Sequence, residues 1–426
     1  NTLNKRLACD ADLAPYAARV GEHLLQAVLA EYPVVWKSYD PNWREFIGCA
    51  FALMLACFED ALPAETVRRI LASAKIAMEG AIARGRSGFT PLNTNIEIMH
   101  VFLADYFGNR LGDRAAVQYA AGYAEELSKR YAKYHSVCEY NSPTYYGVDL
   151  TAIGFWRKFA VTPRIRELGE IIEAGLWEDV ADMYNHAMRN MCGPFSRNYE
   201  MDMSRHTSLH ALMFLGLGMD RFAERPFNVE SDHNPLLVLC GVHIPEAVQA
   251  RLLKTGGERT VTRQFRELSE RSDTRDNNAL CTATAWITDK LMTGGLSGSK
   301  NVSGQLHPAT VYWRDTLGGV SSMRPLRSGS DGTIDGYHTV VFDCRAERNC
   351  LHIDVESRVN RDIKVFFEFA SAGIPGAVIK KDLWQVAGLT IKVNAQAPDF
   401  FVEKTDGCLR VCYLALDGRP ETKELH

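Results

Sequence analysis

The sequence lacks an excess of charge of either sign and a long hydrophobic run. Its 48 basic and 52 acidic residues leave a formal charge of −4, so nothing builds the concentrated positive field that nucleic-acid binding requires. The longest nearly uninterrupted apolar run, Phe46 to Phe58, contains Gly48 and is too short to span a bilayer. We therefore expect neither a nucleic-acid partner nor a membrane partner.

Paired cysteine motifs are also absent. The eleven cysteines are scattered from Cys9 to Cys412 without a Cys-x-x-Cys spacing, so neither a zinc ribbon nor a redox pair is indicated. No signal-peptide pattern begins the chain at Asn1, which is compatible with a processed secreted protein. The glycosylation acceptor pattern Asn301-Val302-Ser303 supports the extracellular location that we expect.

What the sequence does contain is the composition of a globular protein and, up to about residue 225, a helical period. Apolar residues recur three and four positions apart, and the length of 426 residues predicts two or three domains. Helices with one charged face alternate with helices that are apolar on nearly every side. Since the first kind must lie outside and the second inside, the pattern favours an α/α toroid (barrel) over a four-helix bundle. The expected helices are Ala11–Glu31, Asn42–Phe58, Ala64–Ala83, Asn95–Phe107, Arg114–Tyr134, Pro143–Phe159, Ile165–Arg189 and Ser208–Leu217.

From about residue 276 the period changes to two. Alternating or β-branched and aromatic segments are separated by turn signals, and no helical pattern intervenes. The strands should therefore be antiparallel and packed as a sandwich or as stacked layers. We predict an α+β multidomain protein with a toroid catalytic domain (1–225), a connection (226–275) and an antiparallel β-sheet domain (276–426). The clearest strands begin at His338, Leu351, Ile363, Leu389 and Leu409.

Polar and aromatic side chains gather where the apolar helices begin. Inner helices of a toroid run parallel, so these four clusters should meet at one mouth of the barrel. Helix capping explains one oxygen side chain per helix, such as a capping box of Thr94 and Glu97, but not the repeated Tyr, Asn, Arg and Trp. The clusters are Trp36–Trp43, Asn93–Glu97 followed by His100, Glu139–Tyr146 and Arg197–His206.

Several of these residues have a structural interpretation beside the functional one. His100 lies on an apolar stripe and is either a hydrogen-bonded core histidine or a catalytic base. Tyr145 and Tyr146 are adjacent and point in different directions, so one of them should face the cleft. Arg157 lies in an apolar stretch and needs a carboxylate partner or an anionic ligand. The Gly-rich stretch 294–300 lacks the Walker spacing and is interpreted as a loop of the β domain.

A cleft lined by His, Tyr, Asn and Arg suits β-elimination on a uronic acid. The proton removed is α to a carboxylate, and Asn or Arg groups stabilise the enolate-like anion that forms. His100 is the candidate base, and Tyr145 or Tyr146 is the candidate acid. The candidates for binding substrate are the carboxylate-holding Asn95, Asn141, Arg157 and Arg205, with His206, and the ring-stacking Trp36, Tyr39 and Trp43.

Two alternatives stay open. A glycoside hydrolase on the same scaffold would need two carboxyl groups about 5–9.5 Å apart, which Glu139, Asp149, Glu200 and Asp202 could supply. A non-catalytic sugar-binding protein would account for the aromatic residues but would leave Arg157 and the His100 cluster without a function.

The segments from Asn93 to His100 and from Glu139 to Tyr146, together with the Arg205-His206 region, resemble those of polysaccharide lyases that join a toroid to an antiparallel sheet. Within that group the sequence resembles the family-27 L-rhamnose-α-1,4-D-glucuronate lyases, which act on the side chains of gum arabic. The resemblance implies a histidine base at His100 and a carboxylate clamp at Arg157 and Arg205. The Asn-His-Tyr arrangement expected of hyaluronate-type lyases is missing.

The resemblance also bears on cofactors and on the second domain. No cofactor is required by this chemistry. Some toroid lyases bind calcium, but no acidic loop in this sequence fixes ligands for it, so a metal stays open. A segment of the β domain, Leu306–Thr316, should wall the cleft, with His307, Tyr312 or Arg314 touching a carbohydrate substrate.

Overall fold

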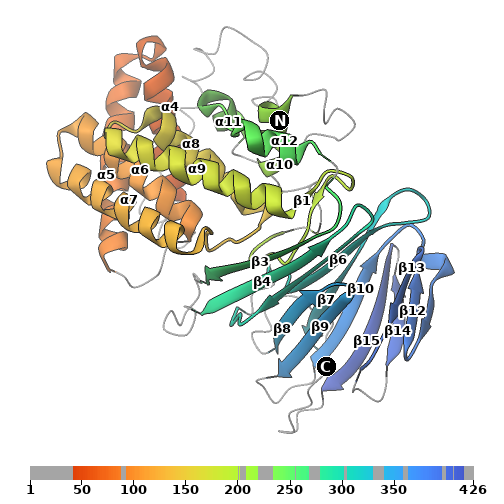
Figure 1. Ribbon diagram of the computed structural model, residues 1–426. Helices are drawn as coiled ribbons and strands as arrows, with labels where there is room; N and C mark the ends of the chain where they lie inside the picture. Colours follow the sequence, from red (N-terminus) through yellow and green to blue (C-terminus); the bar gives the residue numbers. More distant parts are fainter. Residues whose placement is uncertain are drawn as a thin grey trace.

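The structure is a computed structural model in which a helical half lies beside a large antiparallel sheet (Figure 1). The two halves meet where helix α9 ends and the short strand β1 begins. This arrangement confirms the α+β class and the order of helices before strands. The structure describes residues 42–87, 93–199, 201, 208–218, 234–254, 256–267, 279–301, 305–329, 340–357, 363–395, 400–405 and 407–416.

The helices form two layers that alternate along the chain. The inner layer contains α4 (Trp43–Phe58), α6 (Thr94–Leu111), α8 (Pro143–Phe159) and α10 (Ser208–Leu217), each packed on the next. The outer layer contains α5 (Ala64–Ser87), α7 (Arg114–Tyr134) and α9 (Pro163–Met183). In α8 every residue from Pro143 to Trp156 is buried, as expected for a helix covered on all sides. The predicted alternation of apolar and amphipathic helices therefore corresponds to a physical layering.

Helix ends follow local chemistry. Ser142 caps α8 by accepting the amide N–H of Tyr145, and Pro143 stands at the first helical position as predicted. The predicted capping box at α6 is wrong, because Asn93 is the N-cap and the Glu97 carboxylate binds the Tyr123 hydroxyl at 2.8 Å instead. The predicted helix Ala11–Glu31 lies outside the described residues.

Helix α9 is shorter than the predicted Ile165–Arg189. It ends at Met183, and the chain turns into a two-stranded hairpin of β1 (Tyr184–Asn185) and β2 (Asn190–Met191). Arg189 adopts a left-handed conformation with φ 52°, which no helix accommodates. The helical spacing of apolar residues therefore continues in the sequence past the end of α9. The helix ends earlier because the Asn and Gly-Pro residues that follow favour a turn.

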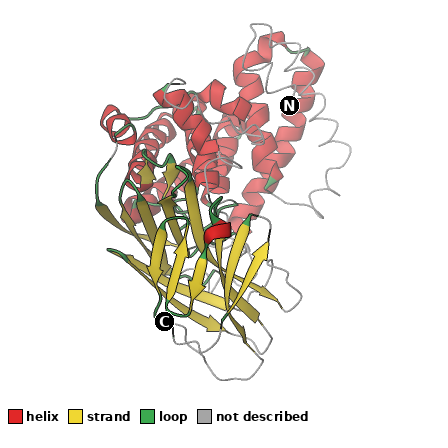
Figure 2. Ribbon diagram, turned by 90° about the vertical axis from the view of Figure 1, so that its right-hand side faces the viewer, coloured by secondary structure: helices red, strands yellow, loops and turns green. Residues whose placement is uncertain are grey.

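The main sheet has eight strands in the order β14-β15-β10-β7-β6-β5-β4-β3, all antiparallel. Their bounds are β3 (Arg259–Arg266), β4 (Leu280–Ile287), β5 (Leu291–Ser297), β6 (Ala309–Arg314), β7 (Val320–Gly329), β10 (Ile363–Ala370), β14 (Phe401–Thr405) and β15 (Cys408–Leu416). A hairpin of β8 (Val340–Glu347) and β9 (Cys350–Ser357) packs on β4 and β5. A small sheet of β11 (Val378–Lys380), β12 (Leu383–Val386) and β13 (Leu389–Lys392) packs beside β10 and β15 through Trp384. Figure 2 shows the strands gathered below the helices.

The segment expected to be a connection, 226–275, contains regular structure. Helices α11 (Asn234–Cys240) and α12 (Glu246–Leu252) pack on α8 and α9, and β3 is the edge strand of the main sheet. The sheet therefore begins before residue 276. The prolines and charged residues of this segment predicted an irregular region. The short helices and the strand between the prolines have too few residues to show a clear period.

Two adjacent glycines in β5 allow both faces of the sheet to be covered. A Cβ on Gly294 would lie 1.8 Å from the carbonyl oxygen of Gly193, and one on Gly295 would lie 2.8 Å from the backbone of Ala346. Successive residues of a strand face opposite sides, so the helical half approaches at Gly294 and hairpin β8–β9 approaches at Gly295. The interpretation of 294–300 as a loop is wrong for residues 294–297, which lie in β5.

One hydrophobic core runs from the helices into the sheet. It joins residues of the inner helices, such as Phe102 and Trp156, with Phe265, Ala283 and Leu296 of strands β3, β4 and β5. Tyr140, before α8, stacks on Phe265 with ring centroids 4.8 Å apart. The two halves are therefore held rigidly enough to shape a site between them.

We expect Gly294→Ala to lower the free energy of unfolding by about 1–3 kcal/mol, because the added methyl group forces the backbone at Gly193 away from the sheet. The matched control is Gly122→Ala on the exposed face of α7, where a Cβ meets no atom within 4 Å. That variant should gain about 1 kcal/mol from helix propensity. Urea unfolding of both variants measures the difference, and equal stabilities would contradict the close contact.

Candidate active site

The segment after α9 fixes the geometry between the two halves. We call residues 184–199 the junction segment. Its Phe195 exchanges backbone hydrogen bonds with His307 at 3.1 and 3.0 Å, and the Gly193 amide donates to Thr310 Oγ1 at 3.1 Å. On the helical side, Asn141 Nδ2 donates to the carbonyls of Cys192 and Pro194. Because the segment is bonded on both sides, its side chains are held in fixed positions.

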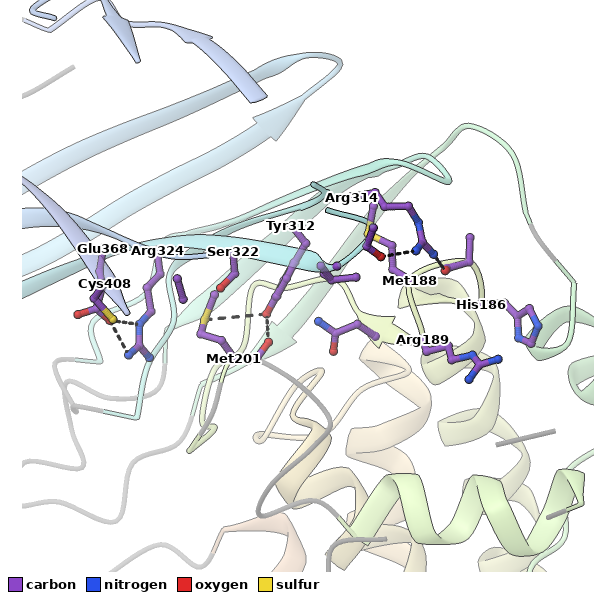
Figure 3. A pocket seen from close by; sticks show the side chains of 16 residues that line it. His186, Met188, Arg189, Met201, Tyr312, Arg314, Ser322, Arg324, Glu368 and Cys408 are labelled. Atoms are coloured by element: carbon purple, nitrogen blue, oxygen red, sulfur yellow. Dashed lines mark hydrogen bonds and ion pairs between the residues drawn. The ribbon is translucent and has the colours of Figure 1, made fainter. Parts of the chain in front are cut away.

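A cavity of about 740 Å³ lies between the junction segment and the face of β6, β7 and β10. Figure 3 shows its lining, with Arg324 and Glu368 at one end, Tyr312 and Met201 in the middle, and Arg189 and His186 at the other end. A cavity of this size is large enough for an oligosaccharide of a few residues. The lining also contains the polar residues Asn190, Arg314 and Ser322.

Guanidinium groups dominate the charge of the described lining. Arg314 donates to the carbonyls of Ala187 and Gly318, which fixes the β1–β2 hairpin to the end of β6. Arg324 binds one carboxylate oxygen of Glu368 at 3.0 Å, and Arg410 binds the other at 2.9 Å. The described lining carries three arginines, Arg189, Arg314 and Arg324, and one carboxylate, that of Glu368. Such a lining favours an anionic ligand.

A tyrosine cluster of Tyr145, Arg197 and Tyr199 lies at the N-terminal end of α8. The Arg197 guanidinium carbon lies 4.2 Å from the centre of the Tyr145 ring, and the Tyr145 hydroxyl donates to the Tyr199 hydroxyl oxygen at 3.2 Å. Burial raises the pKa of Tyr145 while the Arg197 charge opposes that rise, and Tyr145 stays a protonated donor. Tyr199 is 49% exposed. Because two residues span at most about 7 Å, Tyr199 is close to Met201, which lines the cavity.

His307 links the tyrosine cluster to the arginines of the cavity. Its Nε2 lies 3.2 Å from the carbonyl oxygen of Asn198, and its Nδ1 lies 3.4 Å from Arg324 Nη1. A neutral ring with its proton on Nε2 satisfies both contacts. Burial, followed by the charge of Arg324, lowers the pKa of His307 to about 3. His307 therefore positions Asn198 and Arg324 as a neutral group.

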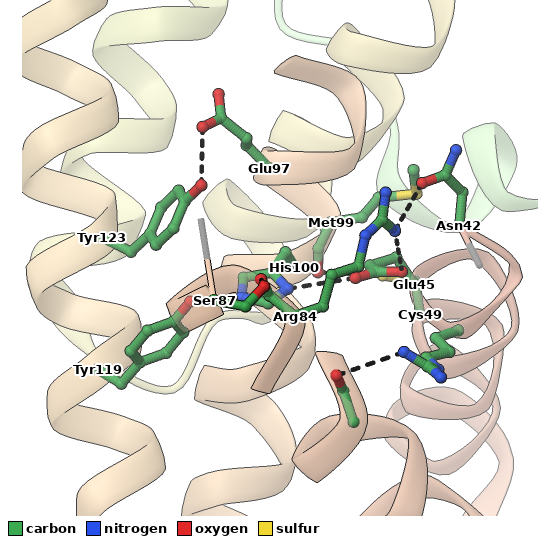
Figure 4. A network of polar contacts seen from close by, with 12 residues as sticks. Asn42, Glu45, Cys49, Arg84, Ser87, Glu97, Met99, His100, Tyr119 and Tyr123 are labelled. Atoms are coloured by element: carbon green, nitrogen blue, oxygen red, sulfur yellow. Dashed lines mark hydrogen bonds and ion pairs between the residues drawn. The ribbon is translucent and has the colours of Figure 1, made fainter. Parts of the chain in front are cut away.

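His100, the predicted base, lies between the inner and outer helices. It has no exposed surface, and its two ring nitrogens contact the Glu45 carboxylate at 3.2 Å and the Tyr119 hydroxyl at 2.9 Å (Figure 4). Arg84 adds a contact of 4.0 Å to the other oxygen of Glu45. This is the geometry of a buried, hydrogen-bonded core histidine.

The other candidates on α6 and around α8 are distributed over several environments. Tyr145 contacts Tyr199, whereas Tyr146 has no exposed surface, so the two adjacent tyrosines do point in different directions. Asn95 is 2% exposed, and its Oδ1 has no hydrogen-bond partner among the described residues. Asn141 binds the backbone of the junction segment and positions it rather than facing the cavity.

Arg157 has the carboxylate partner that its apolar surroundings required. Its Nε donates to Glu173 at 2.5 Å, and its Nη2 donates to the Gly241 carbonyl at 3.1 Å. It stands twelve residues after Tyr145 on α8, about 18 Å along the helix, at the opposite end from the tyrosine cluster. Trp43 is 38% exposed on the first turn of α4. Trp36, Tyr39, Arg205 and His206 lie outside the described residues.

Two carboxyl groups expected for a hydrolase lie beneath the tyrosine cluster. Glu139 and Asp149 are both buried, and Asp149 has no exposed surface. Burial, followed by the charge of Glu139, raises the pKa of Asp149 well above its ordinary value. Both effects favour the protonated form of Asp149, which is held away from solvent.

Sequence reasoning found part of this site. Tyr312 and Arg314, expected to reach the cleft from the β domain, do line the cavity. His186 and Arg189 were missed because they were assigned to the end of the predicted helix Ile165–Arg189, and Asn190, the next residue, was not singled out. The signal that could have found them is the Gly193-Pro194 pair, which marks a turn just beyond them. Arg324 lay in a strand pattern and carried no signal of its own.

The helical side of the cavity matches a known family. Residues 24–234, just under half of the chain, are similar to a family described as "Domain of unknown function (DUF8769)". The match spans helices α4 to α10 and the junction segment but not the main sheet. No curated protein matches the chain.

Two further properties hold for the part of the chain that the structure describes. No helix there is long and apolar enough to cross a membrane. Within the same residues, no group of three or more His, Cys, Asp or Glu side chains is placed to hold a metal ion.

The burial of His307 predicts a pH dependence of stability. Between about pH 3 and pH 6.5 the unfolded chain binds a proton at this histidine that the folded chain does not, so stability falls as the pH falls. At about pH 5 the loss reaches about 2 kcal/mol. Urea unfolding at pH 5 and pH 7 should show a smaller loss for His307→Gln than for the wild type. The same substitution at exposed His352 controls for removal of an imidazole, and identical losses in wild type and His307→Gln would contradict the account.

Proposed function

We propose that this protein is a carbon–oxygen lyase that cleaves a glycosidic bond to glucuronate by β-elimination. The observation that carries the proposal is the cavity between the helices and the sheet, whose described lining joins three arginines to tyrosine, histidine and amide side chains. This set matches a hydroxyl-rich ligand that bears a carboxylate. The reaction needs no cofactor.

In this proposal the arginines stabilise the negative charge that develops in the first step of the reaction. The proton at C5 of a glucuronate is only weakly acidic, and removing it places a second negative charge on the carboxylate group. Guanidinium groups that already bind the carboxylate stabilise that charge without reorganising. Arg324 is the candidate that is linked to the segment of the tyrosine cluster, since His307 contacts both Arg324 and the carbonyl oxygen of Asn198.

The tyrosine cluster supplies the proton transfer in this proposal. Tyr199, as a phenolate, takes the C5 proton; the bond from C4 to the glycosidic oxygen breaks, a C4–C5 double bond forms, and Tyr199 returns the proton to the departing oxygen. Tyr145 donates its hydroxyl hydrogen bond to the Tyr199 oxygen, and the Arg197 cation lies beside them. In this proposal both groups stabilise the negative charge that the reaction places on Tyr199, a residue that is half-exposed.

The finer assignment follows the resemblance of the sequence. We propose that the alternating inner and outer helices are part of an α/α toroid and that the substrate is the rhamnosyl-α-1,4-glucuronate end of plant gum side chains, from which L-rhamnose is released. An extracellular location fits a polysaccharide substrate. The layering of α4 to α10 supports the toroid. The preference of the cavity for an anionic ligand supports a substrate that contains a uronate.

The alternative is a glycoside hydrolase that acts on oligosaccharides containing uronic acid. One observation favours it: burial and the charge of Glu139 raise the pKa of Asp149, which favours the protonated form that a general acid needs. However, Asp149 has no exposed surface, so a glycosidic oxygen does not reach it in this structure.

Incubation with gum arabic and with a rhamnosyl-glucuronate oligosaccharide should raise the ultraviolet absorbance, because elimination conjugates a new double bond with the carboxylate. Free rhamnose should appear in step with that absorbance. Sugar release without the absorbance would support the hydrolase and overturn the lyase.

Tyr199→Phe should lower kcat for this elimination by about 100-fold or more while changing KM little, because only the proton-transferring oxygen is removed. The matched control is Tyr134→Phe on the outer helix α7, which should keep the wild-type rate. A Tyr199→Phe enzyme with wild-type kcat would exclude Tyr199 as the base.

A further inference from the structure

Asn190 is a buried amide that its neighbours leave without hydrogen bonds. It lies in β2, is 2% exposed and lines the cavity. Neither its Nδ2 nor its Oδ1 has a hydrogen-bond partner among the described residues. Leaving a buried polar atom unsatisfied costs about 1–3 kcal/mol, so a side chain with both polar atoms unsatisfied calls for a ligand.

The surroundings of Asn190 are cationic. Arg189 is the preceding residue, held at φ 52° in the turn of the hairpin, and it lines the same cavity. Arg314 lines it from β6, with its guanidinium fixed to the Ala187 carbonyl. Figure 3 shows this hairpin end of the cavity on the far side of Tyr312 from Arg324 and Glu368. The cavity therefore has a second cationic end, at the hairpin.

We propose that Asn190, Arg189 and Arg314 form a second carboxylate subsite, which binds a hexuronate residue other than the one that is cleaved. The subsite rests on the proposed function, since it takes the ligand to be an acidic glycan. Its consequence is a substrate class: a glycan with at least two uronate residues, one at the tyrosine cluster and one at the hairpin.

The chemistry of an amide distinguishes a uronate from other anions. Nδ2 donates to a carboxylate oxygen, and Oδ1 accepts from a hydroxyl group of the same sugar ring, so both unsatisfied atoms find partners. The dianionic group of a phosphate monoester offers only acceptors and by itself would leave Oδ1 unsatisfied. A neutral sugar would satisfy the amide but would offer the two guanidinium groups no carboxylate to bind.

Calorimetric titration with two probes tests the subsite without relying on turnover. The first probe is an oligosaccharide with two glucuronate residues, and the second is the same oligosaccharide with the non-scissile glucuronate as its methyl ester. Wild-type protein should bind the diacid at least about tenfold more tightly than the ester. Asn190→Asp has the same shape but places a negative charge at the subsite, so the preference should be abolished or reversed.

Arg189→Gln is the second variant, since this side chain is only half-buried and its loss should leave the fold intact. It should reduce the preference for the diacid severalfold. Asn394→Asp, which makes the same charge change at an exposed position after β13, should retain it. Thermal unfolding confirms that each variant is folded before it is titrated.

The outcomes separate the two proposals. Equal binding of diacid and ester by wild type, or an unchanged preference in both folded variants, overturns the subsite even if the enzyme is a lyase. A preference for the diacid that both variants remove supports the subsite, including the case in which no unsaturated product forms and the lyase proposal fails.

Discussion

The close contact between the junction segment and strand β5 is the constraint on which the rest of the structure depends. Gly294 has no Cβ, so the carbonyl of Gly193 can lie directly against the sheet. That contact sets the distance between the halves. From it follow the bridge of Phe195 with His307, the position of Tyr199 two residues before the cavity-lining Met201, and the attachment of the hairpin to Arg314. A site between two domains needs such a fixed spacing, because catalytic groups act only when they are held within a fraction of an ångström.

The layering of the helices and the antiparallel strands could be predicted from periodicity alone. Helices α7 and α8 have the predicted bounds, since Asp113 and Ser142 cap them and their apolar faces are unambiguous. Prediction failed at the end of α9, where the local sequence favours a turn although the helical spacing of apolar residues continues. It also failed at Gly294 and Gly295, where neighbouring segments lie so close that only glycine fits. These are tertiary constraints, which a pattern along the chain does not contain.

The candidate site was predicted less well, for a related reason. His100 and Arg157 were notable because polar residues in apolar stretches need partners, and the structure supplies those partners as Glu45 and Glu173. The residues that line the cavity stand on the hairpin and on β6, β7 and β10, far apart along the chain. Their proximity results from the packing of the two halves, so no spacing in the sequence reveals it. Tyr145 lies at the start of an inner helix, as expected, where it contacts Tyr199; its role as an acid stays a prediction.

The most direct test of the account is the mass of the uronate-bearing product formed from one defined rhamnosyl-glucuronate oligosaccharide. Elimination keeps the glycosidic oxygen on the departing rhamnose and leaves the uronate with a double bond. The account therefore predicts a uronate product that lacks one water relative to the product of acid hydrolysis. A uronate product identical in mass to that of acid hydrolysis would contradict it.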